Sequence, residues 1–207
     1  EAGININDLI KYKEEKGSIV GYPKGTFDKN PNNSLYVKCD ILIPSALENA
    51  IILDNVDRIN AKLIVEAANG PISYRANSEL VKRNIPILPD IYANAGGVAV
   101  SYFEWIRNIS HIRLGRMNRR YEENRGRDIV NAINQISDKE LPDTSIQSIV
   151  YGAREEDIVN SGLEDTMRVA FQEIKNLMNT HNLSDYRTSA YGIAIKKLEK
   201  SYLELGI

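Results

Sequence analysis

Cys39-Asp40-Ile41-Leu42-Ile43-Pro44 is a short apolar run closed by a proline, and two similar runs follow it at intervals of about 22 residues. They are Leu63-Ile64-Val65, which precedes the turn Asn69-Gly70-Pro71, and Ile85-Pro86-Ile87-Leu88-Pro89. Runs of Ile and Val bounded by Pro and Gly are typical of strands buried on both faces. The segments between them, such as 78–84, are compatible with helix. Strand, helix and strand at this spacing predict a parallel sheet of the α/β class.

Beyond Asn94 the hydrophobic period becomes helical. Residues 113–150 are polar and Arg-rich, and we interpret them as an insertion between two helices of one α/β domain. Four sets of apolar residues have helical spacing: Val98, Tyr102, Trp105 and Ile109; Ile129, Ile133 and Ile136; Met167, Phe171, Ile174 and Met178; and Tyr191, Ile195, Leu198 and Tyr202. We expect the last two of these stripes, both within the last sixty residues, to pack in a core.

The composition of the 207 residues is that of an ordinary globular protein, with 43% hydrophobic and 26% charged residues. The formal net charge of −2 argues against a polycationic nucleic-acid binder, and no apolar stretch is long enough to span a membrane. Cys39 is the single cysteine and cannot form an internal disulfide. Because residue 1 is Glu and no signal-peptide pattern follows it, we expect an N-terminus that is processed, trimmed or not the natural start.

Small-residue turns follow all three predicted strands, at Pro44-Ser45-Ala46, Asn69-Gly70-Pro71 and Asn94-Ala95-Gly96-Gly97. The carboxyl edge of a parallel sheet, where these turns would meet, is where open α/β sheets bind ligands. The last turn opens a helix whose N–H groups favour an anion, and Ser101 lies one turn further along. A Gly-Gly turn before a helix is also often only a turn. The usual phosphate-binding fingerprints, GxGxxG and GxxxxGK[ST], are missing.

Other candidate chemistry is weak. His111 and His181 have no spacing that suggests a metal site, and no Ser-His-Asp or Cys-His arrangement is supported. Acidic residues interrupt a basic cluster, which indicates a solvated or intersubunit helix face rather than a nucleic-acid contact. The cluster is Arg113, Arg116, Arg119, Arg120, Arg125 and Arg127.

Glu66-Ala67-Ala68-Asn69-Gly70-Pro71 and, above all, the segment 94–105, Asn-Ala-Gly-Gly-Val-Ala-Val-Ser-Tyr-Phe-Glu-Trp, closely resemble hexameric glutamate dehydrogenase. The segments 17–23, 39–44 and 185–191 also resemble family segments in the expected order. The resemblance extends over essentially the whole chain. It implies oxidative deamination of L-glutamate to 2-oxoglutarate and ammonia, with hydride transfer to NAD or NADP.

The resemblance also implies roles for individual residues. Asn69 and Asn94 are expected against the nicotinamide half of the cofactor, and Ser45 and Ala46 in the cofactor cleft. In the substrate pocket, Val98 is expected near the reacting carbon. Ser101 is expected to hydrogen-bond the side-chain carboxylate of glutamate. No metal is implied.

By the same resemblance, residues 1–112 are a partial NAD(P)-binding Rossmann-like domain without its first strands. Residues 113–150 are an antenna-like insertion, and 151–207 are the pivot and C-terminal helices. The glycine fingerprint, the catalytic Lys and Asp and the substrate domain are expected in a preceding part, so this chain alone is predicted to be inactive. The alternative is a catalytically dead fragment retained as a structural or regulatory subunit of a larger assembly.

The resemblance further implies a homo-hexamer of the full-length chain. Because antenna-containing members are mostly mitochondrial, we expect the mitochondrial matrix, with the cytoplasm as the alternative. Three departures from the family bear on allosteric control. Glu156 and Asn160 replace a Lys and a His that contact GTP, and Val169 replaces an Arg at the ADP site. Partial substitution by the neighbouring Arg168 is the alternative at the ADP site. Regulation by GTP and ADP is therefore doubtful, and the preference between NAD and NADP is left open.

Overall fold

The computed structural model describes residues 3–111, 116–137, 141–151 and 153–206. Arg113 of the predicted basic cluster lies outside them. The described elements run from α1 (Ile6–Lys16) and a 3-10 helix, η1 (Pro31–Tyr36), through a small sheet to a set of helices. The sheet region contains β1 (Cys39–Leu42), η2 (Val56–Arg58), β2 (Ala61–Val65), α2 (Tyr74–Lys82) and β3 (Ile87–Leu88). The helices that follow are α3 (Asp90–Ala93), α4 (Ala95–Ser110), α5 (Arg116–Ile136), α6 (Asp143–Val150), α7 (Glu155–Thr180) and α8 (Tyr186–Leu205).

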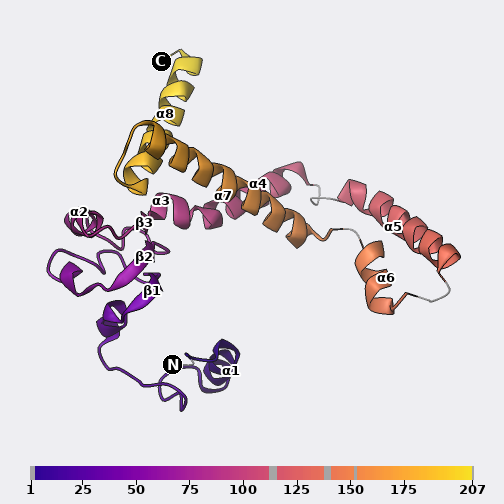
Figure 1. Cartoon of the computed structure of the whole chain (residues 1–207). Coiled ribbons are helices and arrows are strands. Elements are labelled where there is room, and N and C mark those ends of the chain that lie inside the picture. The colour runs from indigo at the N-terminus through magenta and orange to yellow at the C-terminus, as the bar shows by residue number, and fades with distance from the viewer. Residues whose placement is uncertain (1–2, 112–115, 138–140, 152, 207) are drawn as a thin grey trace.

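Within the described residues, three strands form one parallel sheet in the order β1-β2-β3 (Figure 1). Ile41 aligns with Leu63, and Ile64 aligns with Ile87. The predicted parallel α/β sheet is therefore confirmed. The third strand is only two residues long, since prolines at 86 and 89 flank it and proline has no N–H to donate to a neighbouring strand.

The hydrophobic core lies between one face of the sheet, α2 and η2. Ser73 caps α2 by accepting a hydrogen bond from the Ala76 N–H, and the helix turns Ala76 and Leu80 onto fully buried Ile64. Burial on both faces was predicted for every strand, and this is wrong for β1. Ile41 is 54% exposed, because none of the described residues covers the face of β1 on which it lies.

The helices after β3 extend from the sheet, with α7 crossing α4 and α8 seated on β3, α3 and α7 (Figure 1). The predicted packing stripe of α7 is confirmed, since Ile174 is 5% exposed and Phe171 stacks on Tyr186. The stripe predicted for α8 is wrong. Its four large side chains are 48–62% exposed, because the helix turns small residues such as Ser189 and Ala190 inward instead.

Helices α5 and α6 pack against each other as a hairpin that stands away from the sheet (Figure 1). Gly126 of α5 permits the close approach, because a Cβ there would collide with the Ile149 carbonyl and lie 2.8 Å from the Val150 Cα. Buried Val130 faces inward, whereas Ile136, from the predicted stripe, is 87% exposed.

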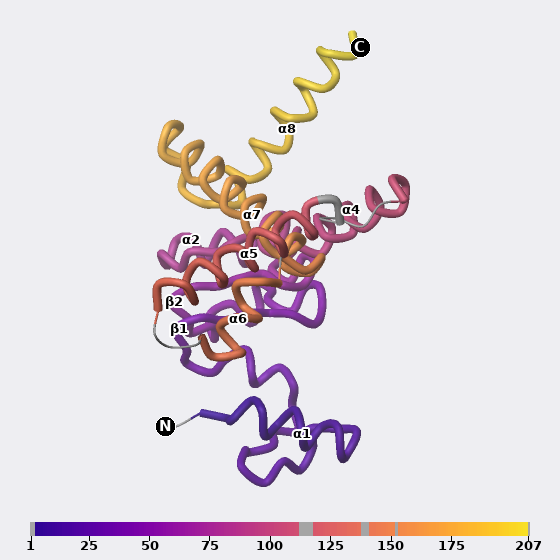
Figure 2. The backbone as a smooth tube through the Cα atoms, turned by 90° about the vertical axis from the view of Figure 1, so that its right-hand side faces the viewer, coloured from indigo at the N-terminus to yellow at the C-terminus, as the bar shows by residue number. Residues whose placement is uncertain are grey.

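The two ends of the chain lie at opposite ends of the molecule. At one end α1 is separate from the sheet, and at the other the last turns of α8 project freely (Figure 2). No helix in the described ranges has the length and apolar character needed to cross a membrane.

Candidate functional site

The turns after the three strands meet at the carboxyl edge of the sheet, as predicted. Backbone hydrogen bonds tie the first two turns together, because Ala67 N and Ala68 N both donate to the Pro44 carbonyl, at 3.2 and 2.9 Å. A side chain ties the second turn to the third strand's end, because Gly70 N donates to Asp90 Oδ2 at 2.8 Å. The three turns therefore form one connected surface rather than three independent loops.

Asn69 and Asn94 lie together on this surface. The Asn94 Nδ2 donates to Asn69 Oδ1 at 2.6 Å, although the two residues are 25 positions apart in the sequence. Asn94 precedes the first residue of α4, where an Asn side chain commonly caps the helix. In the described structure Asn94 makes no such cap, because its amide turns to Asn69. The pair still offers amide N–H donors on both side chains and the Asn94 carbonyl oxygen as an acceptor to a ligand.

Ser45 and Ala46 lie at the end of β1, on the same edge, and both are exposed. The Ser45 hydroxyl donates to the Ile43 carbonyl at 2.9 Å, which leaves its oxygen lone pairs available to a ligand. The structure thus places all four residues predicted for the cofactor on the accessible carboxyl edge of the sheet.

Val98 and Ser101 are both exposed on the first turns of α4, and Val98 is 74% exposed. The Ser101 hydroxyl donates to the Gly97 carbonyl of its own helix at 3.0 Å. A Cβ at Gly97 would meet no described atom within 4 Å, so the start of the helix is open. These two residues remain predicted substrate contacts, and they border the open start of α4.

The sequence reasoning missed a buried ionic cluster directly behind this edge. Arg187 of α8 forms ion pairs with Glu66 at 2.6 Å and with Asp90 at 3.2 Å. Burial raises the pKa of the Glu66 carboxyl above its ordinary value, although the charge and hydrogen bond of Arg187 act in the opposite direction. Sequence spacing could not reveal this cluster, since Glu66 and Arg187 are 121 positions apart.

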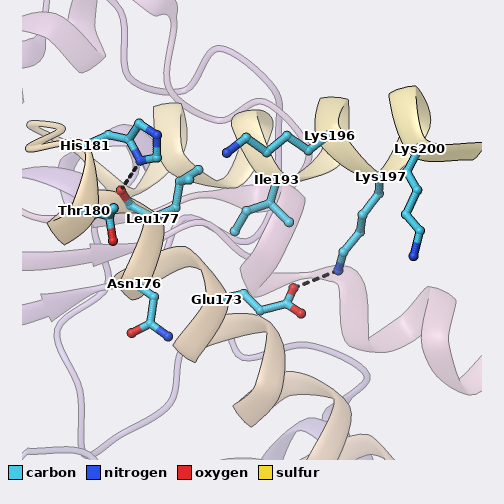
Figure 3. Close-up of a pocket in the computed structure, with 9 residues that line it drawn as sticks. All are labelled: Glu173, Asn176, Leu177, Thr180, His181, Ile193, Lys196, Lys197 and Lys200. Atoms are coloured by element: carbon cyan, nitrogen blue, oxygen red, sulfur yellow. Dashed lines mark hydrogen bonds and ion pairs between the residues drawn. The ribbon is translucent and has the colours of Figure 1, made fainter. Parts of the chain in front are cut away.

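A groove of about 510 Å³ lies elsewhere, between α7 and α8 (Figure 3). Several of its polar side chains have partners within the protein, including Asn176, which accepts from Gln172, and Lys200, which lies 3.6 Å from Glu204. Lys197 pairs with Glu173 at 2.8 Å, and His181 Nδ1 lies 3.3 Å from the Leu177 carbonyl. The groove is open and lies on the helices rather than at the strand ends, so it is not the candidate site.

The three departure positions lie on α7, and all are exposed. Glu156 is 3.9 Å from Arg154, and Val169 is 60% exposed. Arg168, beside Val169, lies 4.0 Å from Glu164. Among the described residues no group of three or more His, Cys, Asp or Glu side chains could hold a metal ion.

The model of the Glutamate/Leucine/Phenylalanine/Valine dehydrogenase family matches residues 1–141, which is more than half of the chain. The chain belongs to this family. The matched range includes the whole sheet, both turns that carry Asn69 and Asn94, and α4.

Curated relatives of this dehydrogenase-family chain are similar along nearly its whole length. It is 44% identical over 204 residues to the mitochondrial glutamate dehydrogenase of Dictyostelium discoideum, with 99% of this chain and 40% of that protein covered. It is 41% identical over 197 residues to a probable glutamate dehydrogenase of Sinorhizobium fredii, with 95% of this chain and 44% of that protein covered. The chain therefore spans less than half the length of these relatives.

Solved structures of glutamate dehydrogenases have the same fold. The enzyme from Peptoniphilus asaccharolyticus is 26% identical with a TM-score of 0.63, and the match covers 100% of this chain and 36% of that one. The hetero-hexameric, leucine-bound enzyme from Thermus thermophilus is 18% identical with a TM-score of 0.71, and the match covers 99% of this chain and 38% of that one. The second likeness concerns the fold alone.

Proposed function

We propose that this chain forms the nicotinamide-facing part of an NAD(P)-dependent glutamate dehydrogenase, which oxidatively deaminates L-glutamate to 2-oxoglutarate and ammonia. The observation that carries the proposal is the Asn69–Asn94 hydrogen bond at the carboxyl edge of the parallel sheet. The names of the relatives supply the choice of glutamate within the family.

The exposed groups at the edge fit a nicotinamide. A carboxamide needs both a donor and an acceptor, and the Asn69 and Asn94 amides offer both in a fixed relation. The neighbouring Ser45 hydroxyl and small Ala46 add no charge and little bulk. When bound, the cofactor accepts the hydride from the substrate carbon.

The residues of this chain would orient the reactants. Asn69 and Asn94 would hold the nicotinamide through hydrogen bonds, and Val98 would pack against the substrate. Ser101 would rotate its hydroxyl from the Gly97 carbonyl to the side-chain carboxylate of glutamate. A hydroxyl donor in the pocket favours a substrate with a side-chain carboxylate over an apolar amino acid.

The test uses the full-length polypeptide that carries this sequence. Wild type should form reduced NAD or NADP when glutamate is added, and Asn94→Ala should lower kcat/KM by about tenfold, the equivalent of one or two hydrogen bonds. Asn108→Ala, on the exposed side of α4, is the matched control and should leave kcat/KM unchanged. An inactive wild type would instead support a structural or regulatory subunit.

Allosteric control is proposed to be weak. Glu156 places an exposed carboxylate where a triphosphate would be repelled, and Asn160 offers no positive charge. The replacement of a charged donor by Val169 removes a charge-assisted contact for ADP. Micromolar GTP should therefore leave the initial rate of the full-length enzyme unchanged, and strong inhibition at that concentration would contradict the proposal.

We further infer a homo-hexamer of the full-length chain located in the mitochondrial matrix. The family resemblance implies the hexamer, and the name of the Dictyostelium relative supports the compartment. The cytoplasm is the alternative location. Light scattering gives the assembly mass, and fractionation of the source cells gives the compartment.

A further inference from the structure

Arg187 uses all three of its guanidinium nitrogens on three separate elements. NH2 donates to Glu66 Oε1 at 2.6 Å, NH1 to Asp90 Oδ1 at 3.2 Å, and Nε to Asn77 Oδ1 at 3.0 Å. Glu66 is fully buried, and the Arg187 side chain is only 18% exposed. These acceptors lie just after β2, at the start of α3 and within α2, so one side chain on α8 joins three parts of the sheet region.

Further hydrogen bonds connect the acceptors of Arg187 to the candidate site. Glu66 Oε2 accepts the N–H of Asp90 at 2.8 Å, which orients the Asp90 carboxylate. The Asp90 Oδ2 in turn accepts the N–H of Gly70 at 2.8 Å. Gly70 is adjacent to Asn69, whose carbonyl oxygen accepts from Asn94 at 2.6 Å. Hydrogen bonds therefore run from α8 to Gly70, and the peptide bond between Gly70 and Asn69 completes the connection to the Asn69–Asn94 pair.

We propose that Arg187 is a positioning residue that fixes the Asn69–Asn94 pair through Asp90, so that the seating of α8 sets the geometry of the cofactor edge. The inference rests on the proposed function for its catalytic consequence. A planar guanidinium can serve these three acceptors at once, whereas a lysine ammonium is a compact point charge on a flexible stem. Arg187→Lys retains the positive charge beside Glu66 but loses the planar fork.

The catalytic test is a double-mutant cycle in the full-length enzyme with Arg187→Lys, Asn94→Ala and the double variant. Arg187→Lys should lower kcat/KM by up to about tenfold, the loss expected for Asn94→Ala, because a residue that acts through the pair cannot cost more than the pair contributes. If Arg187 acts through the asparagine pair, the double variant should be no more than about twofold slower than Asn94→Ala alone. Rate losses that multiply would overturn the proposal. Arg75→Lys, on the exposed side of α2, is the matched control.

A second measurement needs no catalytic activity. Deuterium uptake by the peptide that covers residues 67–71 should be faster in Arg187→Lys than in wild type, while uptake in α5 and α6 is unchanged. Equal uptake at residues 67–71 would overturn the positioning role even if the wild type proved inactive. If uptake there is faster in Arg187→Lys than in wild type but the wild type has no activity, the positioning role stands and only the proposed function is contradicted.

Discussion

At the scale of single residues, Glu66 shows two opposing effects on one carboxylate. Burial disfavours its charged form, while the Arg187 guanidinium at 2.6 Å favours it. Burial is the larger effect and raises the pKa of Glu66 above its ordinary value of 4.5. An ion pair of this kind is weak evidence for stability, since desolvation can offset the attraction. Its value here is geometric, because both carboxylate oxygens are occupied.

The raised pKa of Glu66 predicts a specific pH dependence of stability. The stability that Glu66 contributes to the folded state is fully present below pH 4.5. It is lost as the pH rises through the higher pKa that the carboxyl has in the folded protein. The glutamine of Glu66→Gln does not titrate, so the variant has no such loss of stability. The stability of wild type relative to the variant should therefore fall as the pH rises above 4.5. Urea unfolding midpoints of both proteins, measured from that pH to neutrality, check the sign. A relative stability that grows with pH would mean that the ion pair dominates.

Ser101 should determine the preference for an acidic substrate. Ser101→Ala removes the hydroxyl proposed to bind the side-chain carboxylate, and a hydrogen bond to a charged group contributes about 1.5–3 kcal/mol. We expect kcat/KM for glutamate to fall by about ten- to a hundredfold. The control is Ser110→Ala in the same helix, where the hydroxyl donates to the Arg107 carbonyl. Equal effects of the two substitutions would contradict the role of Ser101.

At the scale of elements, sequence patterns predicted the sheet better than they predicted which helix faces are covered. Proline-bounded Ile and Val runs located all three strands, because that composition favours a buried strand. Periodicity could not show that α8 turns Ser189 and Ala190 inward, since small residues carry little hydrophobic signal. The cofactor asparagines were predicted through the family resemblance. Their pairing, like the Arg187 cluster, is a long-range contact that no local pattern encodes.

The helical hairpin of α5 and α6 depends on Gly126. Gly126→Ala would place a methyl group against the Ile149 carbonyl, and the helices would have to separate. We expect a loss of about 1–3 kcal/mol, the usual effect of overpacking. Deuterium uptake in both helices should rise, whereas Asn131→Ala, at an exposed position of α5, should leave it unchanged. Unchanged uptake in Gly126→Ala would show that the hairpin tolerates a wider spacing.

At the scale of the whole molecule, two helices present large apolar side chains to solvent. On α4, Val98, Tyr102 and Trp105 are 74%, 55% and 56% exposed, and on α8 Leu198 and Tyr202 are 60% and 56% exposed. Contiguous apolar surface of this kind marks an interaction site or an association hazard. The relatives are more than twice as long as this chain.

Residues 1–207 produced alone should therefore self-associate. Sedimentation velocity should show species heavier than the 23.3 kDa monomer, in proportions that rise with concentration. Trp105→Lys combined with Leu198→Lys should reduce this association, whereas lysines at exposed polar positions, Asn118 and Asn134, should not. A monodisperse monomer at all concentrations would show that the apolar faces need no partner.

We propose that this chain belongs to an enzyme that oxidises glutamate. The most direct measurement is the formation of reduced NAD and NADP by the full-length polypeptide, with glutamate, leucine, phenylalanine and valine supplied in turn. We predict reduction that depends on glutamate and is far slower with the three apolar amino acids. Reduction with an apolar amino acid but not with glutamate would contradict the claim, as would the absence of reduction with all four.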